Sequence, residues 1–374
     1  MKSKISDVYF WQNIPSHIQA PGLREFSARW DGDVYGVWCE GITEDRRKMG
    51  WLDPNLGRIK QLVLDVDNPS GHAQEIVRQS AHAIHIFSGL HAYPAIVAAH
   101  SQAVEIGAAN LGLMVEPGIS MGWKGWLRPL RARLLARSYR RSIRIVLAMG
   151  LRGVEFYRRA GFGSEIIFPF MYQSEPATHL ANTDAGDPVK LIYVGKFIPR
   201  KGVDILFNAL AKCRSKNWRL TIVGECPERP KLRHLAGKLG VNGAIEWLGA
   251  QPSSDIPELL AQHDLCLVPS RFEGWGVVTN EALQAGIGVL CSDRVTSKDL
   301  VERSGAGAVF LSSDARAFAS LIDGWVQSPE RIESAKLAAR SYRETLSPES
   351  VGQYLHDVIR YSFVGGARPQ TPWL

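Results

Sequence analysis

The feature that most constrains the fold is an alternation of short apolar runs and amphipathic stretches through the second half of the chain. The apolar runs lie at 189–195, 218–224, 244–249, 265–270 and 288–293. Between them, the stretches at 204–214, 230–240, 256–263 and 279–286 carry apolar residues at helical spacing. Because continuous apolar strands are typical of a parallel sheet covered on both faces, the pattern predicts a doubly wound α/β domain over 189–340.

The first half of the chain repeats this pattern. Its apolar runs lie at 7–11, 33–39, 59–65, 83–89, 112–118 and 143–150. They predict a second α/β domain over 1–172, since 374 residues exceed what one hydrophobic core usually serves. The polar segment 173–188 lacks periodicity, as a linker does, and 341–374 is expected to hold a helix that crosses back to the first domain. Two such domains joined by a hinge predict a ligand-binding cleft at the carboxyl ends of both sheets.

Composition narrows the class of protein. No apolar run approaches the roughly 20 residues of a membrane-spanning helix, and the start of the chain has no signal-peptide pattern. We therefore expect a cytoplasmic protein. The five cysteines form no C-x-x-C pair, which argues against a zinc site or a disulfide framework. The net charge of +7 favours a polyanionic or anionic-lipid partner.

Cations gather at the turn that follows the first strand of the second domain. The turn GKFIPRKG places Lys196, Arg200 and Lys201 just before a predicted helix, where they can bind phosphate oxygens or form a solvated basic turn. Gly195 ends this strand and Gly224 ends the next one. A glycine at each strand end lets a ligand approach the backbone.

Two glutamates flank a glycine-rich bend in the segment SRFEGWGVVTNEALQAG. Glu273 precedes the bend, and Glu281 lies in the helix that follows it. The residues expected to present backbone to a ligand at the start of that helix are Gly276, Val277, Val278 and Thr279. A helix start suits a diphosphate, and Glu281 can accept hydrogen bonds from vicinal hydroxyls such as those of a ribose. With Glu273 facing another part of the same ligand, the segment is suited to a sugar nucleotide.

The chain resembles the family 4 retaining glycosyltransferases of the GT-B fold over about 190–310. The resemblance rests on VGKFIPRKG, WLGAQPSSDIPELLAQHDLCLVPS and EGWGVVTNEALQAG, the last of which is similar to the family's E-x7-E element. It implies two Rossmann-like domains that face each other across a cleft and transfer of a sugar with retention of configuration. It also implies that Glu273 lies by the donor sugar and that Glu281 binds the nucleotide ribose.

The same resemblance assigns Lys196 and Lys201 to the leaving diphosphate, with Lys196 standing where arginine is usual. In the first half, Glu116 in LMVEPG occupies the place of a family histidine near the reacting carbon. It would orient the donor sugar, contact the acceptor hydroxyl, or do neither. His85 and His91 follow a predicted strand and are either ligands in the cleft or structural residues.

A basic stretch at 122–144 interleaves arginines and lysine with tryptophans and leucines. This pattern is typical of a helix at an anionic bilayer surface, which would make the protein peripheral on the inner face of the plasma membrane. The alternative is a solvated basic face with the tryptophans packed inward.

Together these features predict a hexosyltransferase that moves a sugar from a nucleoside diphosphate donor to a saccharide or lipid-linked saccharide, in cell-surface polysaccharide synthesis. No cofactor and no metal are expected: Asp65 and Asp67 form a D-x-D pair, but they follow a strand in the acceptor domain. A sugar-nucleotide epimerase of the same architecture stays open. A nicotinamide oxidoreductase is disfavoured because no G-x-G-x-x-G follows the first strand of either half. A basic nucleic-acid-binding protein is a further alternative that fits the net charge, but no nucleic acid is expected as a partner because the chain shows no recognised binding module.

Overall fold

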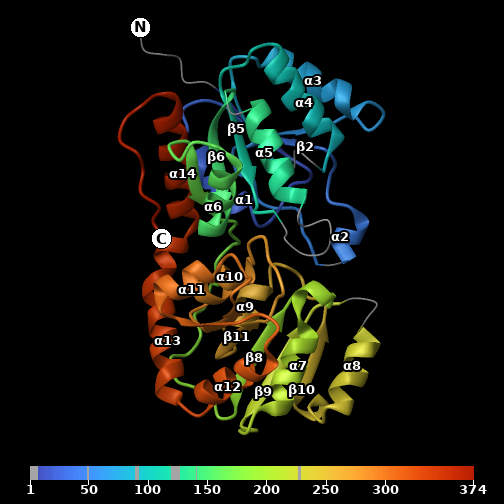
Figure 1. Cartoon of the computed structure of the whole chain (residues 1–374), viewed down its shortest axis with the longest axis vertical. Helices are drawn as coiled ribbons and strands as arrows, with labels where there is room; N and C mark the ends of the chain where they lie inside the picture. Colours follow the sequence, from blue (N-terminus) through green and yellow to red (C-terminus); the bar gives the residue numbers. More distant parts are fainter. Residues whose placement is uncertain (1–6, 49, 89–91, 119–126, 140, 226–228) are drawn as a thin grey trace. The chain divides into compact units, whose positions relative to one another are not determined.

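The computed structural model describes residues 7–48, 50–88, 92–118, 127–139, 141–225 and 229–374 (Figure 1). They form two compact units. Unit 1 comprises Met1–Glu44, Asp53–Gln173 and Pro348–Pro372. Unit 2 comprises Asp45–Leu52, Ser174–Ser347 and Trp373–Leu374.

Unit 1 is built on a seven-stranded parallel sheet with the order β3-β2-β1-β4-β5-β6-β7. Its strands are β1 (Val8–Gln12), β2 (Val34–Trp38), β3 (Lys60–Val63), β4 (Ile84–Ser88), β5 (Leu111–Val115), β6 (Ile143–Met149) and β7 (Ile167–Phe170). Its helices are α1 (Ala20–Arg29), α2 (Glu44–Lys48, which continues into unit 2), α3 (Pro69–Gln79), α4 (Pro94–Glu105), α5 (Leu127–Tyr139), α6 (Gly150–Ala160) and α14 (Pro348–Phe363). Strand β1 is buried along its whole length, as a central strand covered on both faces must be.

Unit 2 has a six-stranded parallel sheet with the order β10-β9-β8-β11-β12-β13. Its strands are β8 (Val189–Val194), β9 (Trp218–Val223), β10 (Ile245–Gly249), β11 (Leu265–Val268), β12 (Gly288–Ser292) and β13 (Gly307–Phe310). Its α-helices are α7 (Val203–Lys212), α8 (Arg229–Lys238), α9 (Ile256–Leu260), α10 (Val278–Gln284), α11 (Lys298–Ser304), α12 (Ala315–Val326) and α13 (Pro329–Tyr342). Short 3-10 turns are η1 (Pro199–Lys201), η2 (Asn242–Ala244) and η3 (Arg343–Leu346). The prediction of two doubly wound α/β sheets is confirmed.

The last long helix, α14, belongs to unit 1 and packs against α1. Its buried residues Val351 and Leu355 lie on the face that meets this helix, and the Trp30 and His356 rings make an edge contact with centroids 5.8 Å apart. Phe26 of α1 is fully buried. The chain therefore returns to the sheet of unit 1 after Ser347.

Residues 174–188, which the sequence presents as a linker, pack onto unit 2. Ala181 is buried, and its N–H donates to the Ala285 carbonyl at 2.9 Å. The buried Lys336 ammonium donates to the Asp184 carbonyl at 2.7 Å and to the Asp264 carboxylate at 2.5 Å. Hydrogen bonds thus help to fix a polar segment whose sequence has no periodic pattern. Such hydrogen bonds cannot be read from hydrophobic periodicity.

A second segment of unit 2 comes from the connection between β2 and β3. The Gly50 carbonyl accepts a hydrogen bond from the Ser253 N–H at 2.8 Å, which holds 45–52 beside the residues that follow β10. Nothing in the sequence of 45–52 marks this association.

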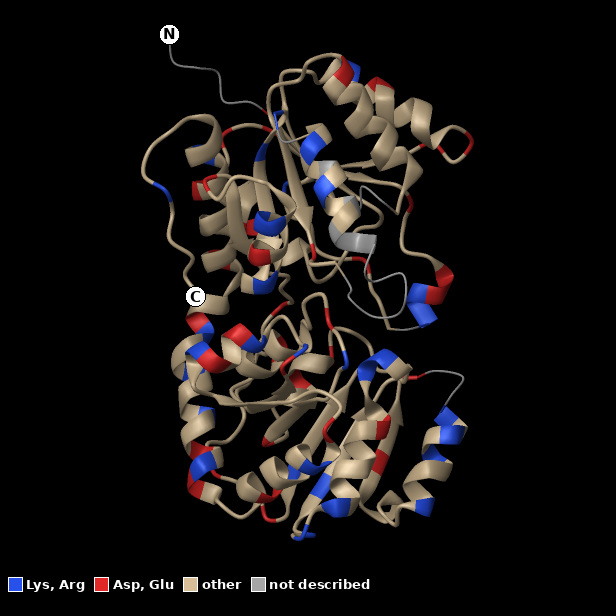
Figure 2. Ribbon diagram, viewed as in Figure 1, with Lys and Arg blue, Asp and Glu red and all other residues tan. Residues whose placement is uncertain are grey.

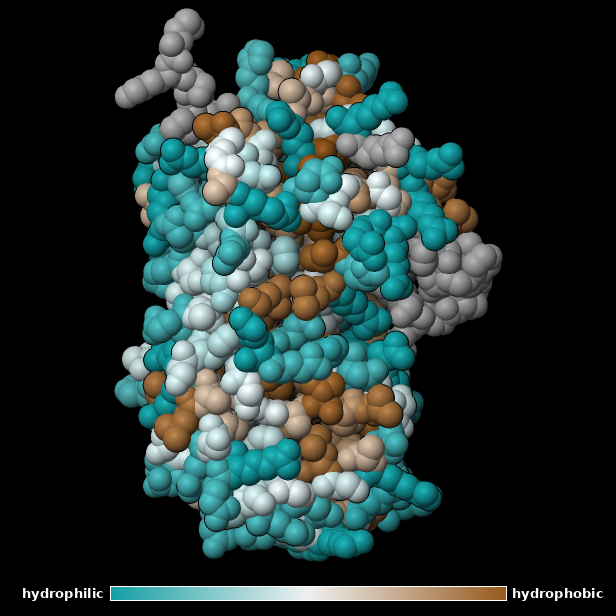
Figure 3. Space-filling model, turned by 60° about the vertical axis from the view of Figure 1, so that its left-hand side comes forward, coloured by the Kyte–Doolittle hydropathy of each residue, from teal (hydrophilic) through white to brown (hydrophobic). Residues whose placement is uncertain are grey.

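None of the helices in the described part of the chain combines the length and the apolar character that crossing a bilayer requires. The face drawn in Figure 3 is mostly hydrophilic, with smaller groups of apolar side chains between the polar ones.

Candidate functional site

Glu273 is the centre of a buried charge cluster at the carboxyl edge of the unit 2 sheet. Only 5% of the residue is exposed. One carboxylate oxygen lies 2.6 Å from the Lys201 ammonium, and the other accepts a hydrogen bond from the Arg200 guanidinium at 2.8 Å. Ser270 donates a further hydrogen bond at 2.9 Å. Burial by itself would raise the pKa of this carboxyl, but Lys201 and Arg200 outweigh it and hold the pKa below its usual value.

The turn that carries these cations is fixed by a second ion pair. Arg271 binds Asp204 through two parallel hydrogen bonds of 2.8 and 2.6 Å, and it also donates to the Pro199 carbonyl at 2.6 Å. Its backbone N–H donates to the Arg200 carbonyl at 2.8 Å. Such two-pronged contacts fix geometry as well as charge. Arg271 and Asp204 were not predicted from the sequence, where they lie far apart.

Lys196 stands in a different electrostatic setting from Lys201. It is exposed at the end of β8, and no carboxylate pairs with it among the described residues. Partial burial lowers its pKa, as do the nearby charges of Arg46, Lys201 and Arg200. Positive charge therefore exceeds negative charge around Lys196, a condition that favours binding of an anion.

Arg46 is a cation of this cluster that sequence reasoning missed. It belongs to the segment 45–52, and its guanidinium lies 4.2 Å from the centre of the Trp51 ring. The Gly50 carbonyl accepts a hydrogen bond from Ser253, which helps to hold the segment where the charge of Arg46 acts on Lys196. No local pattern in the sequence could have shown this.

Glu281 is also buried, with 7% of the residue exposed, but it forms no ion pair with a described cation. Helix α10 begins at Val278 after the bend, as predicted, and carries Glu281 in its first turn. Burial raises the pKa of Glu281 to about 7, although neighbouring Ser174 and Lys201 act in the opposite direction. No ion pair to this carboxyl occurs in the described ranges, so its oxygens can accept hydrogen bonds from a ligand. Ser174 was not predicted, because it lies in the segment taken for a linker.

The remaining predicted residues divide into exposed backbone and packed side chains. Gly276 has φ +100°, and a Cβ there would lie 2.9 Å from a methyl of Val295. Gly276 and Val277 are partly exposed. Val278 and Thr279 are buried, and the Thr279 hydroxyl has no hydrogen-bond partner among the described residues.

Glycine at position 224 is required by the close packing of two strand ends. Its φ is +139°, and a Cβ at this position would lie 2.0 Å from the Gly195 carbonyl oxygen. The ends of β8 and β9 can approach each other this closely only with glycine at 224.

The candidates in unit 1 have different surroundings. Glu116 follows β5 and is exposed, and its carboxylate lies beside the Tyr172 hydroxyl, whose pKa is raised well above its usual value by burial and by this charge. His85 is fully buried, and its ring accepts a hydrogen bond from the Trp11 indole at 3.1 Å. His85 lies within β4 and not after the strand, as the sequence had suggested. Its second ring nitrogen lies 3.0 Å from a backbone carbonyl oxygen, so both ring nitrogens have partners within the protein, and burial lowers its pKa to about 4. His91 lies outside the described residues.

Within the described ranges, no group of three or more His, Cys, Asp or Glu side chains could hold a metal ion. The charges at the site are instead supplied by basic side chains.

Parts of the chain are similar to known proteins. Residues 177–342 match the family model described as glycosyl transferases group 1. The lipopolysaccharide 1,6-galactosyltransferase of Escherichia coli K12 is 28% identical over 164 residues, which cover 42% of this chain and 45% of that protein. The lipopolysaccharide glucosyltransferase WaaG of the same strain is 32% identical over 174 residues, which cover 45% of this chain and 46% of WaaG. The chain thus spans about half the length of the curated relatives it matches.

Solved structures resemble the whole chain. The complex of Anabaena Alr3699/HepE with UDP and glucose superposes with a TM-score of 0.71 at 16% identity, covering 94% of this chain and 98% of that one. The crystal structure of WaaG gives a TM-score of 0.66 at 17% identity, covering 94% and 99%. The architecture is therefore that of the GT-B glycosyltransferases. In sequence, residues 177–342 resemble the glycosyl transferases group 1 family.

Proposed function

We propose that the protein is a retaining hexosyltransferase that moves a sugar from a nucleoside diphosphate donor to a saccharide or lipid-linked saccharide in cell-surface polysaccharide synthesis. The observation that carries the proposal is the pair of buried glutamates in one unit. Glu273 forms ion pairs with Arg200 and Lys201, whereas Glu281 forms none with the described residues. Beside them lies Lys196, a cation without a carboxylate partner in the described part of the chain. A ligand with hydroxyls on both sides of a diphosphate complements this arrangement.

The cations would act on the leaving group. As the bond between the sugar and the diphosphate breaks, negative charge grows on the diphosphate oxygens. Lys196, Lys201 and Arg200 would meet that charge where it develops, and stabilisation that grows towards the transition state raises the rate. In this proposal no metal ion and no cofactor is needed, and the donor itself is the only nucleotide.

The two carboxylates would hold the sugars of the donor. Glu281 would accept hydrogen bonds from the ribose hydroxyls, which favour the charged form of a carboxyl and so lower its pKa on binding. Glu273, kept ionised by Lys201 and Arg200, would lie by the donor sugar. Gly195, Gly224 and the backbone from Gly276 to Thr279 would line the nucleotide. Glu116 of unit 1 would contact the acceptor hydroxyl.

The relatives support the acceptor class. The proteins named above act on lipopolysaccharide by name, and HepE was solved with UDP and with glucose. We extend this to the present chain as a cytoplasmic enzyme that is peripheral on the inner face of the plasma membrane through the basic stretch 122–144. Residues 122–126 and 140 of this stretch lie outside the described residues. Nucleic acid is not proposed as a partner.

The experiment is a thermal-shift screen across nucleoside diphosphate sugars, followed by incubation of the selected donor with and without saccharide acceptors. A ligand that binds only the folded protein raises the unfolding midpoint. We expect one donor family to raise it, and the Glu281→Ala variant to lose that shift. Absence of any shift across the screen would refute donor binding. A new sugar nucleotide formed without acceptor would identify an epimerase instead.

A further inference from the structure

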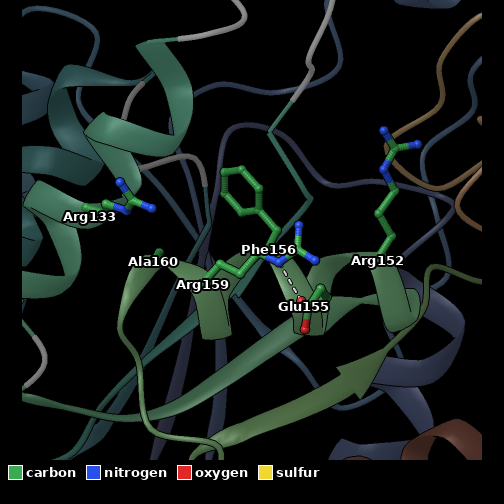
Figure 4. Close-up of a pocket in the computed structure, with 6 residues that line it drawn as sticks. All are labelled: Arg133, Arg152, Glu155, Phe156, Arg159 and Ala160. Carbon is green, nitrogen blue, oxygen red and sulfur yellow. Dashed lines mark hydrogen bonds and ion pairs between the residues drawn. The ribbon is translucent and has the colours of Figure 1, made fainter.

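A cavity in unit 1 lies between α5 and α6, outside the donor site. Its volume is about 400 Å³, within the range of about 300–1,000 Å³ common for small-ligand sites. The residues that line it are Arg133, Arg152, Glu155, Phe156, Arg159 and Ala160. Figure 4 shows Arg133 extending from α5 and the other side chains from α6.

The lining carries an excess of positive charge. Glu155 is the one carboxylate among the lining residues, and it already accepts hydrogen bonds from Arg158 at 2.8 and 2.9 Å and from Arg159 at 2.5 Å. Arg133 is exposed and has no carboxylate partner among the described residues. Phe156 and Ala160 add an apolar wall. A cavity of this kind suits a phosphate group attached to an apolar body.

Helix α5 turns apolar side chains to the outside next to this cavity. Leu130, Arg133, Leu134 and Arg137 follow the spacing i, i+3, i+4, i+7 and so lie on one face of the helix. Leu130 is 51% exposed and Leu134 is 55% exposed, whereas Ala132 and Ala136 on the other side are buried. Figure 2 shows basic residues on both α5 and α6. The exposed face of α5 therefore combines leucines and arginines, where a helix covered only by water would carry polar residues.

We propose that the α5–α6 cavity binds the phosphate headgroup of an anionic phospholipid while Leu130 and Leu134 enter the lipid surface. Charge complementarity selects the anionic headgroup, and the two exposed leucines select a membrane over a soluble phosphate. A sugar phosphate or a nucleic acid would contact the arginines but leave the leucines in water. The inference adds residues of α6 to the proposed membrane contact and does not depend on the donor chemistry.

The test is flotation of the full chain with vesicles of phosphatidylcholine alone and with vesicles of equal parts phosphatidylcholine and phosphatidylglycerol. We expect binding to the anionic vesicles only. The double variant Arg133→Gln with Arg159→Gln should bind about 30-fold more weakly, since each cation near an anionic surface contributes roughly fivefold. The double variant Leu130→Ser with Leu134→Ser should also weaken binding, but by an amount that salt does not change.

A matched control is available in unit 2. A second basic cavity, of about 610 Å³, includes Lys212, Arg214 and Arg316 among its lining. The variant Arg214→Gln with Arg316→Gln removes the same charge and should bind vesicles like the wild type. If the two arginine variants lose vesicle binding equally, net charge explains the binding and the proposed cavity site is wrong. If soluble glycerol phosphate and anionic vesicles raise the unfolding midpoint equally, the membrane assignment is wrong.

Donor binding separates this inference from the proposed function. The Arg133→Gln, Arg159→Gln variant should keep the thermal shift given by the nucleoside diphosphate sugar. If vesicle binding fails while that shift remains in the wild type, the lipid site is wrong and the transferase proposal stands. If the thermal shift is absent and vesicle binding is present, the transferase proposal is wrong and the lipid site stands.

Discussion

The regions around Glu273 and Glu281 lie eight positions apart in the chain, and both glutamates are almost fully buried. Glu273 has Lys201 and Arg200 as partners, and its pKa is lowered. Glu281 has no cation in contact within the described ranges, and burial raises its pKa to about 7. The difference shows that burial alone does not decide the state of a carboxyl. The Glu273 carboxylate has its cationic partners within the protein. The Glu281 carboxyl can still accept hydrogen bonds from a ligand.

The largest expected effect comes from removing the complete charge cluster. Glu273→Gln leaves Lys201 and Arg200 without their carboxylate, and breaking a largely buried ion pair from one side costs about 3–5 kcal/mol of stability. Urea unfolding at neutral pH measures this cost. The matched control is Glu281→Gln, which neutralises a buried carboxyl without such partners and should not destabilise the fold. Similar losses of stability in both variants would show that the cations around Glu273 do not distinguish the two glutamates.

A smaller effect should appear in the pH dependence of stability. A carboxyl with a raised pKa binds its proton more tightly in the folded state, so its contribution to stability falls as pH rises from the unfolded pKa through about 7. We expect wild-type stability to fall relative to Glu281→Gln between pH 5 and 7.5, by up to about 3 kcal/mol. Glu273 acts with the opposite sign, because its lowered pKa contributes stability that is lost as pH falls below its usual value. Unfolding curves of both proteins across this range supply the measurement, and parallel pH profiles would show that Glu281 is ionised without cost.

The effect of Glu281 on the donor should be comparable or smaller. Glu281→Ala removes charged hydrogen bonds to the ribose hydroxyls, which contribute about 1.5–3 kcal/mol, and should therefore weaken donor binding about 10- to 100-fold. Calorimetric titration with the donor found in the screen measures the loss. Donor affinity unchanged in this variant would place the ribose elsewhere.

The smallest predicted effect tests the cation contributed by the segment 45–52. Arg46→Gln should weaken binding of the diphosphate by about 0.5–1 kcal/mol, since the charge acts in a partly solvated site. Lys48→Gln removes an exposed charge from the same helix and serves as the control. If both variants weaken binding equally, Arg46 acts only through net charge.

The sequence predicted the sheets well because a strand buried on both faces must be apolar throughout, and that signal is local. It also predicted the bend and the helix that carry Glu281, since glycine and the E-x7-E spacing are local too. The partners of Glu273 could not be predicted as pairs, because Lys201 and Glu273 meet only through the sheet. Arg46 and Ser174 reach unit 2 from segments whose hydrogen bonds leave no periodic trace. For Leu130 and Leu134 the helix was predicted but their exposure was not, because a helical pattern does not show which face is turned outward.

The most direct test of the central claim is to compare a nucleoside diphosphate with its parent nucleoside by calorimetric titration. The account predicts that Lys196→Ala weakens binding of the diphosphate about tenfold or more and leaves the nucleoside unchanged, because a charged contact to phosphate is worth about 1.5–3 kcal/mol. Lys212→Ala, on the far end of α7, should bind both like the wild type. Wild-type affinity of the Lys196→Ala variant for the diphosphate would contradict the claim that the turn after β8 binds the leaving group.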